Sequence, residues 1–417
     1  MLERDVSSEI TASCKLSERC RFIPGAKQAA IYDFEKGNVY SLNKSAREIV
    51  EGAPDKFNFW KKLVEMDLVE TGKQSRSLEV TESPRVGLEF MWLELTDKCN
   101  QKCLHCYASA NDIVATEERP EINWEKIIAE GKTLGCNGIQ FIGGEPLLFP
   151  GLLDLAQTAK DSGYEFIEIF TNGTLLDEGK VKKIKDLGIN VAVSLYSIDP
   201  NVHDTVTTVL GSFQKTYRAL ELLREAQVPT RIGIIVMRQN QDTLVKTRET
   251  LRDKGFEVVG ADVVRPTGRG SCAELLPKKE VVQKYALTTK PNFVTSEEQF
   301  YRNQYWNSCW AGKIAITSRG EIMPCIFART HIVSRVENGL GGAINGEELQ
   351  SLWKLTKDCI QGCRECEYRY ACHDCRPLAE GATGNLYAKN PRCTYNPVTG
   401  KWNEKRKGGD RNERTRA

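Results

Sequence analysis

The sequence lacks the long apolar segments of membrane and exported proteins. It contains no run of eighteen apolar residues, and its first ten residues, MLERDVSSEI, include neither a basic nor an apolar stretch. A helix that crosses a bilayer needs about twenty apolar residues, and an export signal needs a basic segment followed by an apolar one. We therefore expect a cytoplasmic protein with no membrane contact.

The sequence also lacks an excess of positive charge. It has 58 Lys and Arg against 56 Asp and Glu, a net charge of +2, and residues 1–85 alone have 14 of each sign. Binding to duplex nucleic acid needs a basic surface, so we expect no nucleic-acid partner. Only the end of the chain is basic, with seven basic and three acidic residues in 400–417. This composition predicts a disordered basic tail over 399–417.

Cysteine is the abundant residue that calls for an explanation. There are 15 in 417 residues, and in a chain without an export signal they indicate metal or redox chemistry rather than disulfides. The length and the 40% hydrophobic content are sufficient for two or three domains with buried cores.

A repeated β/α unit occupies the middle of the chain. Short β-branched runs alternate there with amphipathic stretches of helical length, which predicts a parallel sheet, either open or curled into a partial barrel. The expected strands are 90–95, 138–142, 166–170, 190–195, 230–236 and 257–264. The expected helices are 124–134, 152–162, 178–187, 214–226 and 241–254. In such sheets the reactive groups follow the carboxyl ends of the strands.

The two flanks of this unit differ from it. In residues 1–85 a hairpin precedes a helix that Asn43 can cap and a second helix over 56–66, which predicts a winged-helix-like module. A peptide added as a strand to the hairpin edge is the partner expected for this module. In residues 301–398 cysteines and turn residues replace the β/α rhythm, so we expect a small domain that metal helps to hold together.

Three cysteines follow the first expected strand at close spacing. Cys99, Cys103 and Cys106 can hold three irons of a cubane cluster and leave the fourth iron open for a ligand. The alternative is a zinc knuckle, which needs a fourth ligand and would have to recruit His105.

The Cys-x3-Cys-x2-Cys loop with Tyr107, followed by Gly143-Gly144-Glu145-Pro146, resembles the radical S-adenosylmethionine (SAM) superfamily. The resemblance implies a partial (β/α)6 TIM-type barrel over 86–300. It also implies that SAM binds to the open iron and is split there to a 5′-deoxyadenosyl radical.

The resemblance further implies which residues contact SAM. The two glycines let the backbone approach the ligand, and Glu145 accepts from its ammonium group. Turn capping is the alternative role of the residues after the later strands. The expected cofactor-binding residues are Tyr107, Gly143, Gly144, Glu145, Pro146, Thr171, Asn172 and Ser194.

The C-terminal cysteines resemble the SPASM extension, which holds two auxiliary iron–sulfur clusters. The resemblance implies that the first of these clusters binds to Cys309, Cys325 and Cys375, and the second to Cys363, Cys366, Cys372 and Cys393. Cys359 or a substrate side chain would complete the first. Zinc ribbons are the alternative for the Cys-x2-Cys pairs.

Residues 29–51 resemble the peptide-recognition domain related to the chaperone of pyrroloquinoline quinone biosynthesis. Taken together, these resemblances imply a radical SAM maturase that binds a precursor peptide by its leader. It would oxidise the peptide to a thioether, carbon–carbon or carbon–oxygen cross-link, with flavodoxin or ferredoxin as reductant. Cys272, after the last strand, is a candidate hydrogen donor to a substrate radical.

Two other functions remain open at this point. One is a sulfatase-type maturase that makes formylglycine; its relatives carry an aspartate where Ile326 follows Cys325. The other is a non-catalytic iron–sulfur or zinc regulatory protein.

Overall fold

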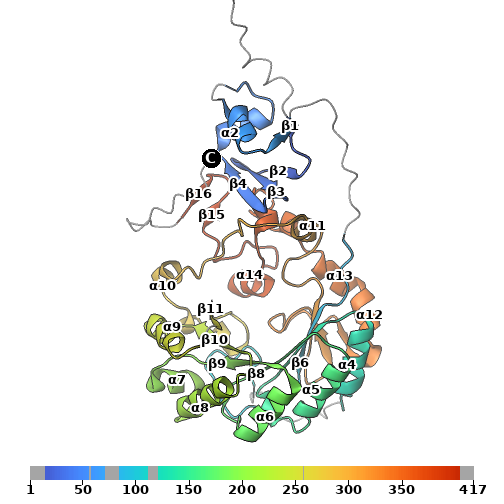
Figure 1. Ribbon diagram of the computed structural model, residues 1–417, viewed down its shortest axis with the longest axis vertical. Coiled ribbons are helices and arrows are strands. Elements are labelled where there is room, and N and C mark those ends of the chain that lie inside the picture. Colours follow the sequence, from blue (N-terminus) through green and yellow to red (C-terminus); the bar gives the residue numbers. More distant parts are fainter. Residues whose placement is uncertain (1–14, 56–57, 71–83, 111–120, 257, 404–417) are drawn as a thin grey trace, which may run out of the picture.

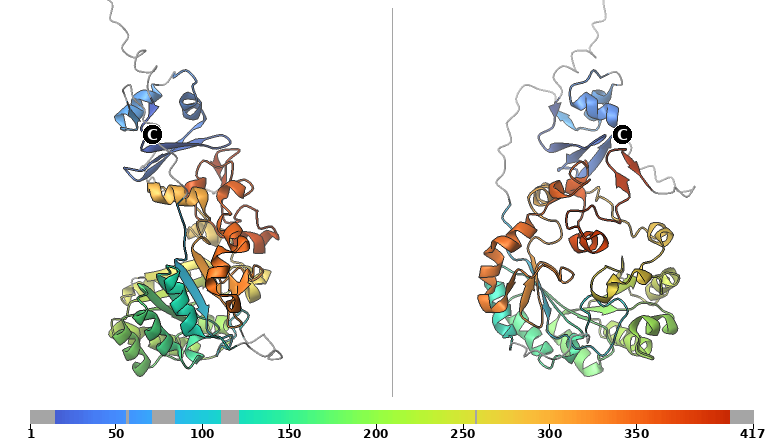
Figure 2. Two further views of the ribbon diagram at one scale, coloured as in Figure 1. Left: turned by 90° about the vertical axis from the view of Figure 1, so that its right-hand side faces the viewer. Right: turned by 180° about the vertical axis from the view of Figure 1, so that it is seen from behind.

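The computed structural model describes residues 15–55, 58–70, 84–110, 121–256 and 258–403. Figure 1 shows a small N-terminal module at one end, a barrel at the other, and the C-terminal segment between them. The side and rear views in Figure 2 show the same order. Within the ranges described, no helix is both long and apolar enough to cross a membrane.

A nine-stranded sheet forms the barrel, in the order β11-β10-β9-β8-β7-β6-β12-β13-β14. Its first six strands pair in parallel with their neighbours in the chain. The predicted partial barrel of six β/α units is thereby confirmed. The strands are β6 (Phe90–Glu94), β7 (Gly138–Ile142), β8 (Phe166–Thr171), β9 (Asn190–Ser194), β10 (Thr230–Val236), β11 (Val258–Val263), β12 (Lys313–Ile316), β13 (Glu321–Met323) and β14 (Ser334–Arg335).

Amphipathic helices cover the outside of this sheet (Figure 1). In α5, for example, Leu152, Leu155, Ala156 and Ala159 are buried, which is the spacing of one helical face. The helices are α4 (Trp124–Thr133), α5 (Leu152–Asp161), α6 (Glu178–Leu187), α7 (Pro200–Thr207), α8 (Ser212–Glu225) and α9 (Leu244–Asp253). Of these, α7 was not predicted, although Asp199 caps it and Pro200 occupies its first turn.

The C-terminal segment is more regular than we expected, and it takes part in the barrel. Strand β12 pairs in parallel with β6, so residues predicted to belong to a separate cysteine-rich domain extend the central sheet. The apolar residues of β12 are fully buried there. The helices beyond the barrel are α10 (Lys279–Lys284), α11 (Glu297–Tyr305), α12 (Leu340–Asn345), α13 (Glu347–Trp353) and α14 (Arg376–Thr383). Short 3-10 turns are η1 (Pro146–Leu148), η2 (Gly268–Ser271), η3 (Ala273–Leu275), η4 (Val336–Asn338), η5 (Lys357–Cys359) and η6 (Arg369–Ala371).

The start of the predicted tail is ordered. Strand β16 (Lys401–Trp402) pairs with β15 (Tyr395–Asn396), and Trp402 packs on the ring of Tyr395 at 4.7 Å between centroids. The prediction of disorder is therefore wrong for 399–403, because the ring of Trp402 packs on the ring of Tyr395 and holds this segment against the folded chain. Residues 404–417 lie outside the described part of the chain.

The N-terminal module contains a three-stranded antiparallel sheet, β2-β3-β4. Asn43 caps the first helix as predicted, accepting from the backbone N of Ala46 at 2.9 Å. The second helix begins at Phe59 rather than at residue 56; residues 56–57, like Cys14, lie outside the described ranges. The elements are β1 (Lys15–Leu16), β2 (Cys20–Pro24), β3 (Ala29–Asp33), β4 (Asn38–Leu42), α2 (Lys44–Val50), α3 (Phe59–Glu65) and β5 (Val69–Glu70).

This sheet is buried on both faces. One face packs on α2 and α3 through Ile31, Leu42 and Leu63. The other packs on the C-terminal segment, where Tyr32 contacts the ring of Phe300 and donates to the carbonyl of Glu367 at 3.0 Å. The module is thus held against the cysteine-rich segment by apolar contact as well as by polar contact.

Candidate functional site

The carboxyl ends of the barrel strands surround a cavity of about 160 Å³. Its wall includes most of the residues that the sequence predicted to bind cluster and cofactor. These are Cys99, Cys103, Cys106, Tyr107, Gly143, Gly144, Thr171, Asn172 and Ser194. Residues from four successive strand ends therefore meet at one place, as expected for a parallel barrel.

Two of the three thiols of this cavity are poor at holding negative charge alone. Burial raises the pKa of Cys99 to about 11, and burial with the two neighbouring thiols raises that of Cys103 to about 12. A cationic group is needed for them to act as thiolates. In the described residues no three Cys, His, Asp or Glu side chains converge on a single ion. Cys99, Cys103 and Cys106 nevertheless border one cavity, as a cluster that takes each thiolate at a different iron requires, and His105 lies on the same wall.

Arg269 holds the cysteine loop from the opposite side of the barrel. Its Nε donates to the carbonyl of Cys103 and its Nη1 to that of Ala110, both at 2.9 Å. Its backbone N donates to the carbonyl of Cys106 at 3.0 Å. These three hydrogen bonds make Arg269 a clamp on the loop.

The two glycines after β7 permit a close approach between backbone segments. A Cβ on Gly143 would meet the carbonyl oxygen of Thr96, and one on Gly144 would meet that of Lys98. The N of Gly144 donates to Thr96 at 2.6 Å and the N of Glu145 to Lys98 at 2.9 Å. The glycines therefore let the end of β7 pack against the loop that carries the cysteines, a constraint that we had ascribed to the cofactor.

Glu145 and Pro146 are not on the wall of the cavity. Glu145 is fully buried, and its carboxylate accepts from Thr171 Oγ1 at 2.5 Å, Asn172 N at 2.8 Å and Leu147 N at 3.1 Å. Burial raises its pKa to about 7. Its observed role is to tie the loop after β7 to the loop after β8, and Pro146 begins η1 in that loop.

Cys272 also lies away from the cavity. It follows η2, is exposed, and is absent from the cavity wall. The structure does not bring this thiol to the place where a substrate carbon would react.

Several wall residues were missed from the sequence. Tyr196, two residues beyond β9, lies on the same wall as Ser194 and Cys103; its position after a strand end was the available signal. Phe327 packs against Tyr107 with 5.1 Å between ring centroids. It comes from the C-terminal segment, so nothing local in the sequence could place it there.

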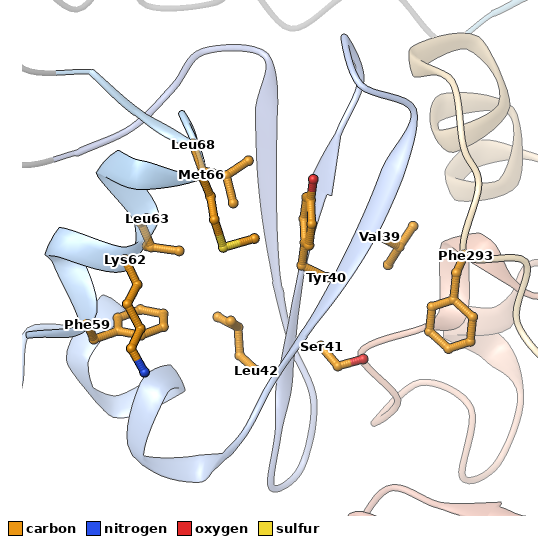
Figure 3. Close-up of a pocket in the computed structure, with 10 residues that line it drawn as sticks. All are labelled: Val39, Tyr40, Ser41, Leu42, Phe59, Lys62, Leu63, Met66, Leu68 and Phe293. Atoms are coloured by element: carbon orange, nitrogen blue, oxygen red, sulfur yellow. The ribbon is translucent and has the colours of Figure 1, made fainter. Parts of the chain in front are cut away.

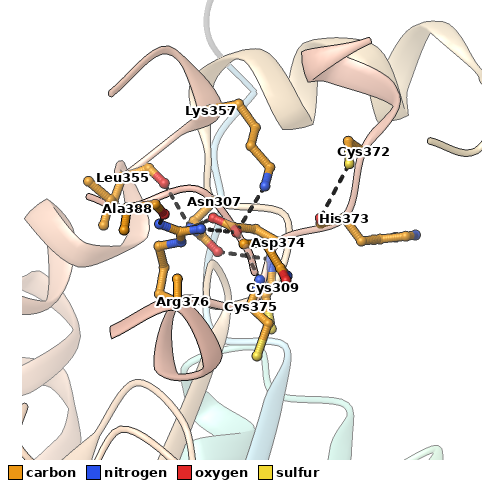
Figure 4. Close-up of polar contacts among 12 residues, drawn as sticks. Asn307, Cys309, Leu355, Lys357, Cys372, His373, Asp374, Cys375, Arg376 and Ala388 are labelled. Atoms are coloured by element: carbon orange, nitrogen blue, oxygen red, sulfur yellow. Dashed lines mark hydrogen bonds and ion pairs between the residues drawn. The ribbon is translucent and has the colours of Figure 1, made fainter. Parts of the chain in front are cut away.

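The C-terminal cysteines gather into two sets. The first set is Cys309, Cys325 and Cys375: burial raises the pKa of Cys309 to about 12, and the other two thiols add to the rise. The second set is Cys363, Cys366, Cys372 and Cys393, which act on one another in the same way. Figure 4 shows Cys375 beside Cys309 and well apart from Cys372. These are the two groupings that the sequence predicted. Cys359 is exposed, unlike the members of the first set.

Arg265 links the cavity to the first set. It lines the cavity, lies over the ring of Phe327 at 4.4 Å and lies near the side chain of Cys375. An ion pair with Asp262 at 2.6 Å fixes its orientation.

A second cavity, of about 240 Å³, lies in the N-terminal module between β4 and α3 (Figure 3). Its walls are mostly apolar, with Leu42, Leu63 and Met66 among them. Strand β4 is the edge of its sheet. One end of that edge is taken by the chain itself, where Val39 N donates to the carbonyl of Phe293 at 3.0 Å. We call this site the β4–α3 groove.

Comparison with known proteins places the barrel in a family. Residues 93–251 match the Radical SAM superfamily. This part of the chain is a Radical SAM domain. Radical SAM enzymes use SAM and a [4Fe–4S] cluster, and the thiol triplet and the strand-end loops of this cavity fit both.

Three known proteins illustrate what this radical SAM enzyme is similar to. The AdoMet-dependent heme synthase of Methanosarcina barkeri is 26% identical over 77% of this chain and 99% of its own. The PqqA peptide cyclase of Granulibacter bethesdensis is 26% identical over 76% of this chain and 89% of its own. The structure of Streptococcus suis SuiB bound to precursor peptide SuiA has a TM-score of 0.53 at 13% identity, and the match covers 91% of this chain and 99% of that one.

Proposed function

We propose that this enzyme oxidatively modifies a ribosomally made precursor peptide, forming a thioether, carbon–carbon or carbon–oxygen cross-link. One observation carries the proposal: the cavity lies between the cysteine triplet on one side and, on the other, Ile326 and Phe327, which directly follow Cys325 of the first C-terminal set. A substrate bound there contacts the radical site and an auxiliary site together.

The chain's own residues prepare this cavity for a reactive species. When bound, the cluster and SAM supply a 5′-deoxyadenosyl radical that takes a hydrogen atom from an unactivated carbon. Cys99, Cys103 and Cys106 hold the cluster, and the loops after β7, β8 and β9 hold SAM. Phe170, Ile235 and Phe327 add apolar surface to the wall, which keeps water from the reacting carbon.

We assign the two C-terminal cysteine sets to two auxiliary clusters, making three clusters in all. Removal of two hydrogens from a peptide needs a second electron acceptor after the first hydrogen has gone, and these clusters serve as that acceptor. Because Cys359 is exposed, we assign the fourth position of the first set to a substrate side chain. Flavodoxin or ferredoxin is the proposed external reductant.

We assign the β4–α3 groove to the leader of the precursor. An extended peptide can pair with the free part of the β4 edge and place alternate apolar side chains in the groove. The groove is held on the C-terminal segment by the contacts of Tyr32, so a leader docked there keeps the core of the peptide tethered near the cavity. The names of the PqqA peptide cyclase and of SuiB with its precursor peptide support a peptide substrate.

The match to a heme synthase favours a tetrapyrrole as a second candidate substrate. The two candidates differ in their use of the N-terminal module, because a strand edge beside an apolar groove has a purpose for a peptide and none for a porphyrin. A formylglycine-generating enzyme is disfavoured. Relatives of that type carry an aspartate base at this position, whereas here the apolar Ile326 occupies it and lies on the cavity wall.

The proposal is tested with anaerobically reconstituted enzyme, SAM and dithionite. We expect 5′-deoxyadenosine from the wild type and none from the variant with Cys99→Ala, Cys103→Ala and Cys106→Ala together. Candidate precursor peptides and iron coproporphyrin are then compared as substrates. Consumption of the porphyrin but of no peptide would reject the assignment of a peptide substrate. Release of 5′-deoxyadenosine by the triple variant would reject the assignment of Cys99, Cys103 and Cys106 to the catalytic cluster.

A further inference from the structure

A buried charged network lies between the two C-terminal cysteine sets (Figure 4). At its centre is Asp374, whose Oδ1 is 2.9 Å from Lys357 Nζ and 2.7 Å from Arg376 Nη2. The side chains of all three are at most 5% exposed. Such a cluster is rarely retained for stability, because removing ions from water costs more than their pairing returns. A role connected with the surrounding thiols is therefore the more informative explanation.

The same carboxylate holds the backbone of the first cysteine set. Asp374 Oδ1 accepts from Cys375 N at 2.8 Å, and its Oδ2 accepts from Asn307 Nδ2 at 3.3 Å. The Oδ1 of Asn307 in turn accepts from Cys309 N at 2.9 Å. Two ligands from distant parts of the chain are thus oriented through one pair of side chains.

The cations of the network face the second set. Lys357 lines one small pocket together with Cys372, and Arg376 begins α14 four residues after Cys372. Arg376 is fixed by donation to the carbonyls of Leu386 and Ala388, each at 2.8 Å. Two cations and one carboxylate leave one uncompensated positive charge, which water does not screen at this depth.

The reduction potential of an iron–sulfur cluster depends on the net charge around it, on hydrogen bonds and on exposure to water. We propose that Lys357, Asp374 and Arg376 are positioning residues whose net positive charge raises the reduction potential of the second auxiliary cluster and whose hydrogen bonds fix the ligand geometry of the first. This inference rests on the auxiliary clusters of the proposed function. It assigns a direction to their electron exchange: the buried positive charge makes the second cluster the better electron acceptor.

The test is a potentiometric titration of the full chain followed by electron paramagnetic resonance. Lys357→Met removes a positive charge at nearly constant volume, and we expect the potential of the second cluster to fall. Asp374→Asn removes the negative charge, and we expect the potential of the second cluster to rise. Lys357→Arg keeps the charge and is expected to stay near the wild type. Lys354→Met, three residues away and exposed, is the matched control and is expected to cause no shift.

Opposite shifts from the two charge changes would not arise from a merely structural role. Equal potentials in the wild type, Lys357→Met and Asp374→Asn, with all clusters present, would overturn the inference. If Lys357→Met loses the second cluster, its recovery in Lys357→Arg supports the role of charge, and its loss in both variants contradicts it. The auxiliary clusters themselves are checked first, by iron analysis and spectroscopy of the wild type. A wild type with only the catalytic cluster would overturn the auxiliary assignment of the proposed function rather than the inference about the charged network.

Discussion

Gly143 and Gly144 line the cavity and also permit a close contact between two backbone segments. Their missing side chains allow the end of β7 to lie against Thr96 and Lys98, immediately before Cys99. The sequence was sufficient to single out the glycines, because two of them after a buried strand are conspicuous. It was not sufficient to name their partner, since the contact joins segments more than forty residues apart.

Substitution of Gly144 should therefore act on the iron content. In Gly144→Ala the new Cβ meets the backbone of Asp97 and Lys98 and displaces the cysteine loop, so we expect loss of most of the catalytic cluster and retention of the others. Gly342→Ala, where a Cβ has no atom within 4 Å, is the control and should keep its full iron content. Iron analysis of both purified variants is the measurement. A Gly144→Ala enzyme with the iron content of the control would contradict this account of the glycine pair.

Glu145 is predicted to act on stability. Glu145→Ala leaves the hydroxyl of Thr171 and the N–H of Asn172 without their buried acceptor, and each such group costs about 1–3 kcal/mol. Chemical unfolding followed by circular dichroism should show the loss. Glu165→Ala, at an exposed position, is the control and should change the free energy of unfolding by less than about 0.5 kcal/mol. Equal stability of the two variants would remove the structural role of this carboxylate.

At the scale of elements, the regular part of the chain was the predictable part. The expected strands of the barrel agree with the observed ones to within a residue at each end, apart from the start of β11, which borders residue 257 outside the described ranges. These strands were predictable because buried parallel strands are apolar and β-branched throughout. Strand β12 was missed because it is only four residues long and its parallel partner, β6, is more than two hundred residues earlier in the chain. Short strands are defined by such partners rather than by their own sequence.

The β4–α3 groove gives a prediction for α3 and its end. Met66→Asp puts a charge on the apolar wall of the groove, so we expect at least a tenfold loss of affinity for the leader peptide, a change of about 1.4 kcal/mol. Val64→Asp makes the same chemical change at an exposed position that is not on the wall. Fluorescence anisotropy of a labelled leader measures both. Unchanged affinity in Met66→Asp, or an equal loss in Val64→Asp, would place the leader elsewhere.

At the scale of the whole molecule, the cysteine-rich segment joins the other two parts. It adds β12 to the barrel sheet, packs under the N-terminal sheet and contains both C-terminal cysteine sets. The sequence predicted a peptide-binding module, a barrel and a cysteine-rich segment along the chain. It did not predict that the third would stand between the first two, because that arrangement depends on long-range packing of Tyr32, Phe300 and Tyr368.

The proposed assignment of two auxiliary clusters predicts how many clusters the chain holds. We expect the wild type to hold about three clusters per chain, and the variant with Cys363→Ala and Cys366→Ala to lose one of them while it still cleaves SAM. Cys272→Ser, at an exposed thiol away from all the sets, should keep all three. Iron and sulfide analysis with Mössbauer spectroscopy measures this directly. A wild type with zinc in place of the C-terminal iron would refute the auxiliary assignment.

The central claim is that a precursor peptide is oxidised in the cavity of the barrel. Coexpression of the enzyme with short open reading frames from the same operon, followed by tandem mass spectrometry, tests it most directly. The account predicts a peptide lighter by two hydrogen atoms per modification, with a cross-link that resists fragmentation between the joined residues. It also predicts that the triple variant at Cys99, Cys103 and Cys106 leaves the peptide unmodified. A modified peptide from the triple variant, or unchanged peptides with an active and fully loaded enzyme, would contradict it.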